Sequence, residues 1–136
     1  MMLPDFTAQR DALVALLERV GEVIYTAAPT GTTPRQFLIL GMPEWEPPAA
    51  AVCMSRTRWG VMVVVQRDGI DDQATGAALL ALWPRVVEVL DDATEADPSL
   101  GGVCVTSKVS RADFGSVTLN GRDLPAQIIT LELEGN

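Results

Sequence analysis

Histidine is absent from this 136-residue chain, and other residues that familiar active sites need are scarce. Without histidine there is no Ser-His-Asp or Cys-His catalytic arrangement and no imidazole ligand for a metal. The glycines form neither GxGxxG nor GxxxxGK[ST], the loops that cradle nucleotide phosphates. The two cysteines, Cys53 and Cys104, lie in separate apolar segments, which favours two reduced buried thiols and leaves a disulfide open. These absences predict a protein that is not an enzyme and that holds no cofactor.

Long hydrophobic segments and a leader sequence are also missing. The apolar runs fall well short of the roughly 18 residues that a spanning helix needs, and the N-terminus lacks the basic and apolar regions of a signal peptide. We therefore expect no membrane contact and a cytoplasmic product. The length suits one domain, 1–136. Its hydrophobic share of 48% and mean hydropathy of +0.20 are high for a free-standing monomer.

Positive charge is scarce in the second half of the chain. Residues 68–136 hold twelve acids and four bases, so the net charge of −8 resides there. A protein that grips nucleic acid needs the opposite sign, and direct DNA binding is not expected. The acidic run "DGIDD" (68–72) is explained more simply by helix capping than by a calcium site, because its spacing is not that of an EF-hand. No metal is expected.

Hydrophobic periodicity predicts two helices, over 5–21 and over about 72–92. Asp5 or Thr7 can cap the first helix, and Gly21 stands where a terminating glycine belongs. Pro84 predicts a kink or a break in the second helix, because it removes a backbone donor. The apolar residues expected to be buried on the two helices are Leu13, Leu16, Leu17, Leu79, Leu82, Trp83, Val86 and Leu90.

Five extended segments complete the predicted fold, an α+β domain of order α-β-β-β-α-β-β. We expect two layers, with both helices packed on one face of a mostly antiparallel sheet. The unbroken apolar run Val61–Val65 predicts a central strand that is covered on both faces, either because the sheet curls over itself or because another chain covers it. The predicted strands are 22–26, 37–40, 52–66, 103–110 and 127–134, with a hairpin turn at Asn120-Gly121.

Candidate interface residues lie in three segments that are polar or broken by proline, 27–36, 42–51 and 111–123. Each segment carries an aromatic residue or an arginine, the residue types enriched at interface hot spots. The alternative is that the aromatic residues fold back onto the domain. The candidates are Arg35, Trp45, Phe114 and Arg122.

The order of these segments resembles a known family. The pattern consists of an N-terminal helix, "PRQFLILGMP", alternating Trp59, Val61, Val63 and Val65, then "ALLALWPRVVEVL" and a closing "GRDLPAQIITLELE". It is similar to the tail terminator, or tail completion, proteins of long-tailed, siphovirus-like bacteriophages. The likeness covers nearly the whole chain as pattern and order, and it carries no motif from which single site residues can be transferred.

The resemblance implies a structural virion protein. Subunits of that family form a ring, expected here to be a homohexamer, that caps the tail tube and ends its polymerisation. The ring joins the tail to the head-neck connector, so the implied partners are further copies, the major tail tube protein and the connector. DNA only passes through the lumen, where acidic charge would repel phosphate. The implied location is the virion, after assembly in the host cytoplasm.

Other functions stay open at this point. A different neck or head-completion protein of the virion would have a similar composition. A small α+β ligand-binding regulatory domain would have a similar order of elements, and an enzyme is a third alternative.

Overall fold

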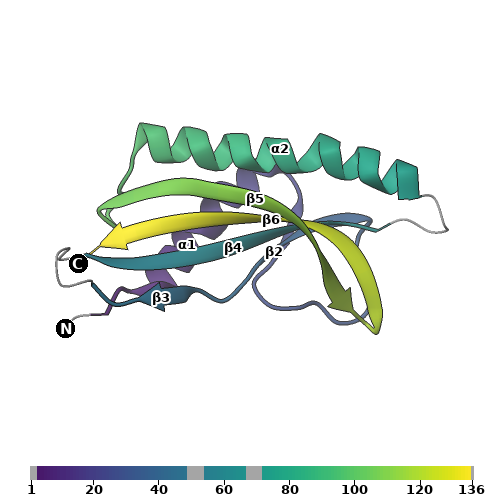
Figure 1. Cartoon of the computed structure of the whole chain (residues 1–136), viewed down its shortest axis with the longest axis horizontal. Coiled ribbons are helices and arrows are strands. Elements are labelled where there is room, and N and C mark those ends of the chain that lie inside the picture. The colour runs from purple at the N-terminus through teal and green to yellow at the C-terminus, as the bar shows by residue number, and fades with distance from the viewer. Residues whose placement is uncertain (1–2, 49–53, 67–71, 136) are drawn as a thin grey trace.

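The structure is a computed structural model that describes residues 3–48, 54–66 and 72–135. Two α-helices and a short 3-10 turn accompany one six-stranded sheet (Figure 1). The sheet is antiparallel except for the pairing of its first two strands. The elements in chain order are α1 (Phe6–Leu17), η1 (Glu18–Val20), β1 (Val23–Tyr25), β2 (Gln36–Leu40), β3 (Glu44–Glu46), β4 (Ser55–Val65), α2 (Asp72–Ala96), β5 (Thr106–Leu119) and β6 (Arg122–Gly135).

The strands lie in the order β1-β2-β4-β6-β5, and β3 extends the sheet beside the first half of β4. This confirms an α+β fold with a mostly antiparallel sheet. The predicted order was wrong by one strand, because β3 forms inside segment 42–51, and the observed order is α-β-β-β-β-α-β-β. Pro43 and Pro47 directly flank β3 without lying inside it. A three-residue strand at the sheet edge needs no amide from either proline, so the prolines did not exclude it.

Helix α1 begins and ends as its sequence predicts. The Asp5 carboxylate accepts a hydrogen bond from the amide of Ala8 at 3.0 Å, which caps the N-terminus. The helix tightens into η1 after Leu17, and Gly21 follows with a φ of +86°, a left-handed conformation that favours glycine.

Helix α2 runs unbroken through Pro84, so the predicted break did not occur. Pro84 is exposed, and the side chain of Leu80, one turn earlier, is 67% exposed. The carbonyl of Leu80, which loses its amide partner to the proline, therefore lies on the solvent side of the helix, where water can satisfy it. The helix also extends four residues beyond the predicted end, to Ala96.

The main core joins buried residues of both helices to alternate residues of β2, β4 and β6. Alternate residues of β4 point into it, from Trp59 to Val65, and the Trp59 indole donates to the buried side-chain oxygen of Gln9 at 3.0 Å. Of the helix residues expected inside, Leu16 and Trp83 are only half-buried. The remaining six are fully buried, namely Leu13, Leu17, Leu79, Leu82, Val86 and Leu90.

The opposite face of the sheet explains the apolar run in β4. Val64 points to that face and is completely buried, while Met62 is half-buried there. The far end of the β5–β6 hairpin bends over this face (Figure 1) and supplies its cover. The sheet thus curls over itself, one of the two alternatives that the run predicted. The cluster under the curl consists of Phe37, Ile39, Val64, Leu119, Leu124 and Ala126.

Strand β5 is longer than predicted. The predicted strand ends at residue 110, but β5 continues through segment 111–123 as far as Leu119 and pairs with β6 on both sides of a bulge between Val109 and Arg111. Its polar residues are tolerated because β5 is an edge strand whose side chains are mostly exposed. The turn at Asn120-Gly121 is confirmed, with φ values of 52° and 75°.

Candidate functional site

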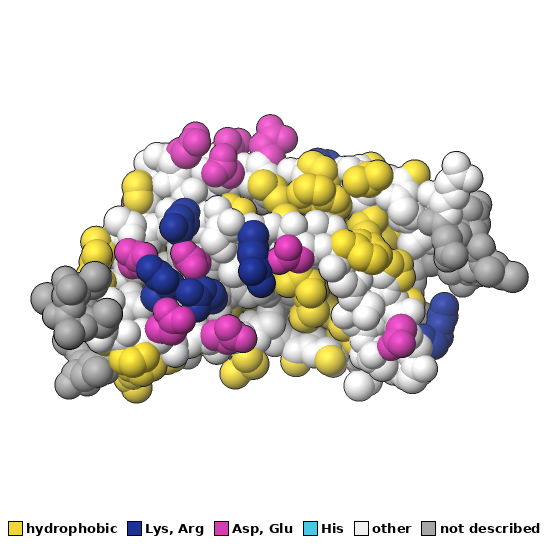
Figure 2. Space-filling view, viewed as in Figure 1, with side chains coloured by type: hydrophobic (Ala, Val, Ile, Leu, Met, Phe, Trp, Pro, Cys, Tyr) yellow, Lys and Arg dark blue, Asp and Glu magenta, His cyan; other side chains and the backbone are white. Residues whose placement is uncertain are grey.

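The face of the sheet opposite the helices carries a continuous group of ion pairs (Figure 2). Arg58 of β4 stands between two neighbouring strands. Its Nη1 lies 2.8 Å from Glu46 Oε1 on β3, and its Nε lies 3.0 Å from Glu132 Oε1 on β6. Lys108 Nζ on β5 lies 3.5 Å from the second oxygen of Glu132. One chain of alternating charges therefore crosses four strands.

Arg56 repeats this arrangement two residues earlier on β4. Its guanidinium lies 3.3 Å from Glu134 Oε1 on β6 and 3.8 Å from Glu46 Oε2. The side chain of Glu132 is only 11% exposed, which makes it the most buried member. We call these six residues the charge lattice, and their three acids and three bases cancel: Glu46, Arg56, Arg58, Lys108, Glu132 and Glu134.

The hydrogen bonds of Arg58 affect the pKa values of two members of the charge lattice, Glu46 and Arg58 itself. The hydrogen bond from Arg58, followed by the positive charge of Arg58, holds the pKa of the Glu46 carboxyl below its ordinary value. The hydrogen bond to Glu46, followed by that to Glu132, raises the pKa of Arg58 above its ordinary value. Both Glu46 and Arg58 are therefore charged across the neutral range.

A hollow of about 580 Å³ adjoins the charge lattice on the same face. Its floor includes Gly41 and Gly60, whose backbones are joined by a hydrogen bond of 2.9 Å, together with Met62 and Ile128. Arg111 of β5 lines its rim. Gly41 and Gly60 have no side chain, and this keeps the hollow open, because no Cβ rises from its floor at either position. This face can accept a protruding side chain or a small ligand.

A second hollow, of about 390 Å³, lies where the β5–β6 turn meets the segment before β2. It contains two of the predicted interface residues, Arg35 and Arg122, both exposed. We call it the arginine pocket, lined by Gly31, Thr32, Thr33, Arg35, Gln66, Leu119, Asn120, Arg122 and Leu124. The sequence flagged the two arginines separately, and the fold brings them together.

The other two predicted interface residues lie elsewhere. Phe114 projects from β5 with 72% of its surface exposed, so it does not fold back onto the domain. Trp45 is half-buried on β3, opposite Thr57 of β4. Its indole nitrogen is buried without a hydrogen-bond partner among the described residues. Trp45 is therefore neither a fully buried core residue nor a freely exposed anchor.

The outer side of α2 carries an acidic cluster that sequence reasoning did not single out. Oxygens of Asp91, Asp92 and Glu95 lie within 4.8 Å of one another, and all three side chains are exposed. Figure 2 shows acidic side chains gathered over this part of α2. The helical spacing of the three acids was available in the sequence, but their concentration on one surface depends on α2 extending to Ala96.

The one cysteine in the described residues, Cys104, has a free thiol. Burial, and then the charge of Asp97, raises the pKa of this thiol to about 11, so it is protonated and unreactive at neutral pH. Cys53 lies outside the described residues. Neither helix among the described residues is long and apolar enough to cross a membrane.

No family model matches this chain, and no curated protein matches it significantly. The fold and its surfaces therefore have to carry the functional conclusion.

Proposed function

We propose that this protein is a structural subunit that assembles with copies of itself into a ring, expected to be hexameric, that ends a phage tail tube. The observation that carries the proposal is the face of the sheet that bears the charge lattice. Its shape is held by ion pairs across four strands and by the curl of the hairpin. A rigid face of fixed charge pattern is suited to register a protein partner, because charge complementarity selects partners and orientation.

The order of elements supports the same proposal through its likeness to tail terminator proteins. In this proposal the subunit is a two-layer body, with both helices on one side of the sheet and the charge lattice on the other. The tube protein, the head-neck connector and neighbouring copies are its partners. The net charge of −8 suits a ring whose lumen must pass DNA without retaining it.

The test is assembly of the purified protein, alone and with tube protein. We expect native mass spectrometry to show a ring-sized oligomer, or a monomer that becomes a ring only on tube ends. Electron microscopy should show that tubes polymerise to a shorter, capped length when the protein is present. A chain that stays monomeric and leaves tube length unchanged would contradict the proposal. A ring that binds the connector but not the tube would identify another neck protein instead.

The hollow beside the charge lattice favours one second candidate, a ligand-binding regulatory domain. Its volume of about 580 Å³ falls within the range of small-molecule sites. Thermal melting with a panel of metabolites tests this function. A ligand that raises the melting temperature of a dimer in a concentration-dependent way, and loses that effect in Ile128→Glu, would favour it over the ring.

A further inference from the structure

The arginine pocket is held in shape by hydrogen bonds from two sides, the hairpin tip and the end of β4. The Asn120 side chain at the hairpin tip donates to the carbonyl of Gly31 at 3.1 Å. The side-chain amide of Gln66, at the end of β4, donates to the carbonyls of Thr33 at 3.1 Å and Pro34 at 2.8 Å. The backbone amide of Gln66 also donates a hydrogen bond to the carbonyl of Arg35 at 2.7 Å. The segment that carries Arg35 is thus fixed against both β4 and the hairpin, so the pocket exists before anything binds.

Neither arginine of this pocket has a neutralising partner among the described residues. Arg35 and Arg122 take part in none of the ion pairs there, and none of the described residues that line the pocket is an acid. The adjacent Asp123 accepts a hydrogen bond from Thr118 and alternates to the other side of β6. Because neither guanidinium group has an ion-pair partner among the described residues, the pocket offers the chemistry that binds a carboxylate or a phosphate.

The acidic cluster of α2 shows the complementary imbalance. Asp91, Asp92 and Glu95 take part in none of the ion pairs among the described residues. They stand in the last two turns of the helix, where the backbone dipole disfavours negative charge, and the last turn holds no base. Asp91 and Glu95 are also one helical turn apart, a spacing at which like charges repel. Folding of the isolated subunit therefore gains nothing from this cluster.

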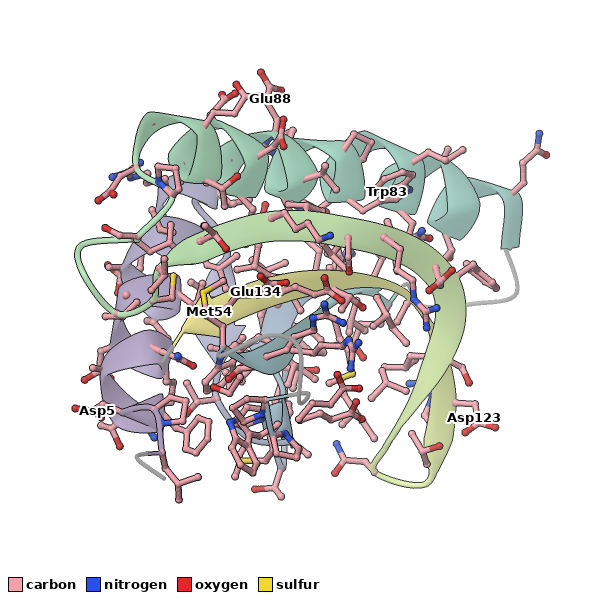
Figure 3. The ribbon with its side chains drawn as sticks, turned by 60° about the vertical axis from the view of Figure 1, so that its left-hand side comes forward. Asp5, Met54, Trp83, Glu88, Asp123 and Glu134 are labelled. Carbon is pink, nitrogen blue, oxygen red and sulfur yellow. The ribbon has the colours of Figure 1, made fainter. Side chains whose placement is uncertain are left out.

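The two surfaces lie far apart on the molecule. Figure 3 places Glu88 on the outer side of α2, near the acidic cluster, and Asp123 on the hairpin beside the arginine pocket, at the other side of the molecule. Two complementary patches at different places on one chain make a head-to-tail contact, which closes into a ring when the rotation per subunit allows it.

We propose that the arginine pocket of one subunit receives the acidic cluster of α2 from a second copy, and that this contact repeats around the assembly. The inference rests on the proposed ring function and adds the surfaces through which neighbours meet. The carboxylates of Asp91, Asp92 and Glu95 are acceptors for the planar donor groups of Arg35 and Arg122. Each surface supplies the charge that the other lacks.

The experiment uses two charge-reversal variants of the full chain, Arg35→Glu/Arg122→Glu and Asp91→Lys/Asp92→Lys. Each destroys one half of the contact and leaves the other intact. Sedimentation velocity across a concentration series should show subunit association weakened about 100-fold or more in each variant. Arg10→Glu/Arg19→Glu is the matched control for the arginine variant, because it makes the same change of net charge on α1 and η1, and it should assemble like the wild type. Circular dichroism confirms that every variant is folded.

The decisive step is to mix the two variants. Each variant retains the surface that the other has lost, and the two reversed surfaces are complementary to each other. The mixture should therefore co-assemble with alternating subunits to the size of the wild-type oligomer, although neither variant assembles alone. A chain that carries all four reversals should assemble again. If wild-type rings form and both variants also form rings, the inference is wrong while the proposed function stands. If the wild type is monomeric even on tube ends, both are wrong.

A phosphate group is the other ligand that this chemistry could bind, and the same variants distinguish it. Inorganic phosphate and a short DNA duplex are titrated against the wild type and Arg35→Glu/Arg122→Glu at physiological salt. Binding that is lost in the arginine variant, with unchanged oligomer mass, would overturn the proposal and assign the pocket to phosphate. Absence of such binding, together with loss of the oligomer, supports it.

Discussion

The charge lattice and the two unpaired charge surfaces differ in one respect, the presence of partners. In the charge lattice every acid contacts a base across neighbouring strands, and the sum is zero. The arginine pocket and the acidic cluster each hold charge of one sign that the described residues do not neutralise. Exposure does not separate them, because several lattice side chains are also partly exposed.

Charges that are paired within the subunit contribute to its folding stability. Charges without a partner in the subunit are available for contacts with another chain. Removing a paired charge leaves another charge unsatisfied and destabilises the subunit. Removing an unpaired charge relieves repulsion and leaves the fold intact, so its cost is seen only in assembly. The same substitution should therefore have opposite effects on stability at the two places.

The largest effect on stability is expected at Glu132, the most buried member of the charge lattice. Glu132→Gln keeps the shape of the side chain and removes the charge that Arg58 and Lys108 contact at 3.0 and 3.5 Å. We expect the free energy of unfolding to fall by about 1–3 kcal/mol, measured by urea denaturation. An unchanged urea midpoint would show that the ion pairs of Glu132 do not contribute to the stability of the fold.

Glu95→Gln is the matched substitution at the acidic cluster, with a smaller effect of opposite sign. It removes a like-charge contact with Asp91 and a negative charge from the C-terminal turns of α2. The free energy of unfolding should rise by roughly 0.3–0.5 kcal/mol, seen as a small increase of the melting temperature. The same variant should associate more weakly than the wild type. A loss of stability would mean that Glu95 has a partner within its own chain.

Whether a structural feature could be predicted from the sequence depends on how close together in the chain the residues that form it are. The cap at Asp5, the stripes of both helices and the turn at Asn120-Gly121 follow from residues close together in the chain, and the structure confirms them. The curl over Val64 was one of two alternatives, because it depends on where the hairpin bends.

Features that depend on register were not predictable. Arg56 and Arg58 stand two residues apart in the sequence, but their acids lie 78 and 74 residues away on β6, and only the strand pairing brings them together. Likewise, Arg35 and Arg122 were flagged by residue type, and their shared pocket arises from the tertiary contact between Asn120 and Gly31.

The smallest predicted effect concerns acid conditions and Glu46. The folded-state pKa of Glu46 lies below its ordinary value of 4.5, because Arg58 donates a hydrogen bond to the carboxylate and lies beside it with opposite charge. The unfolded chain therefore takes up this proton first as the pH falls. The stabilisation from Glu46 is fully present above about pH 5 and is lost as the pH falls below 4.5 and through the folded-state pKa.

The measurement is the difference in unfolding midpoint between the wild type and Glu46→Gln, followed from pH 7 to pH 3. The difference should be small and constant down to about pH 5 and shrink toward zero below it. In an Arg58→Gln background the same comparison should show little dependence on pH, because the group that lowers the pKa of Glu46 is gone. A difference that persists at pH 3, or that survives in the Arg58→Gln background, would mean that Glu46 stabilises the sheet through contacts other than its charge. The charge lattice would then end at Arg58, and β3 would be held by its backbone pairing with β4 and by uncharged contacts of Glu46.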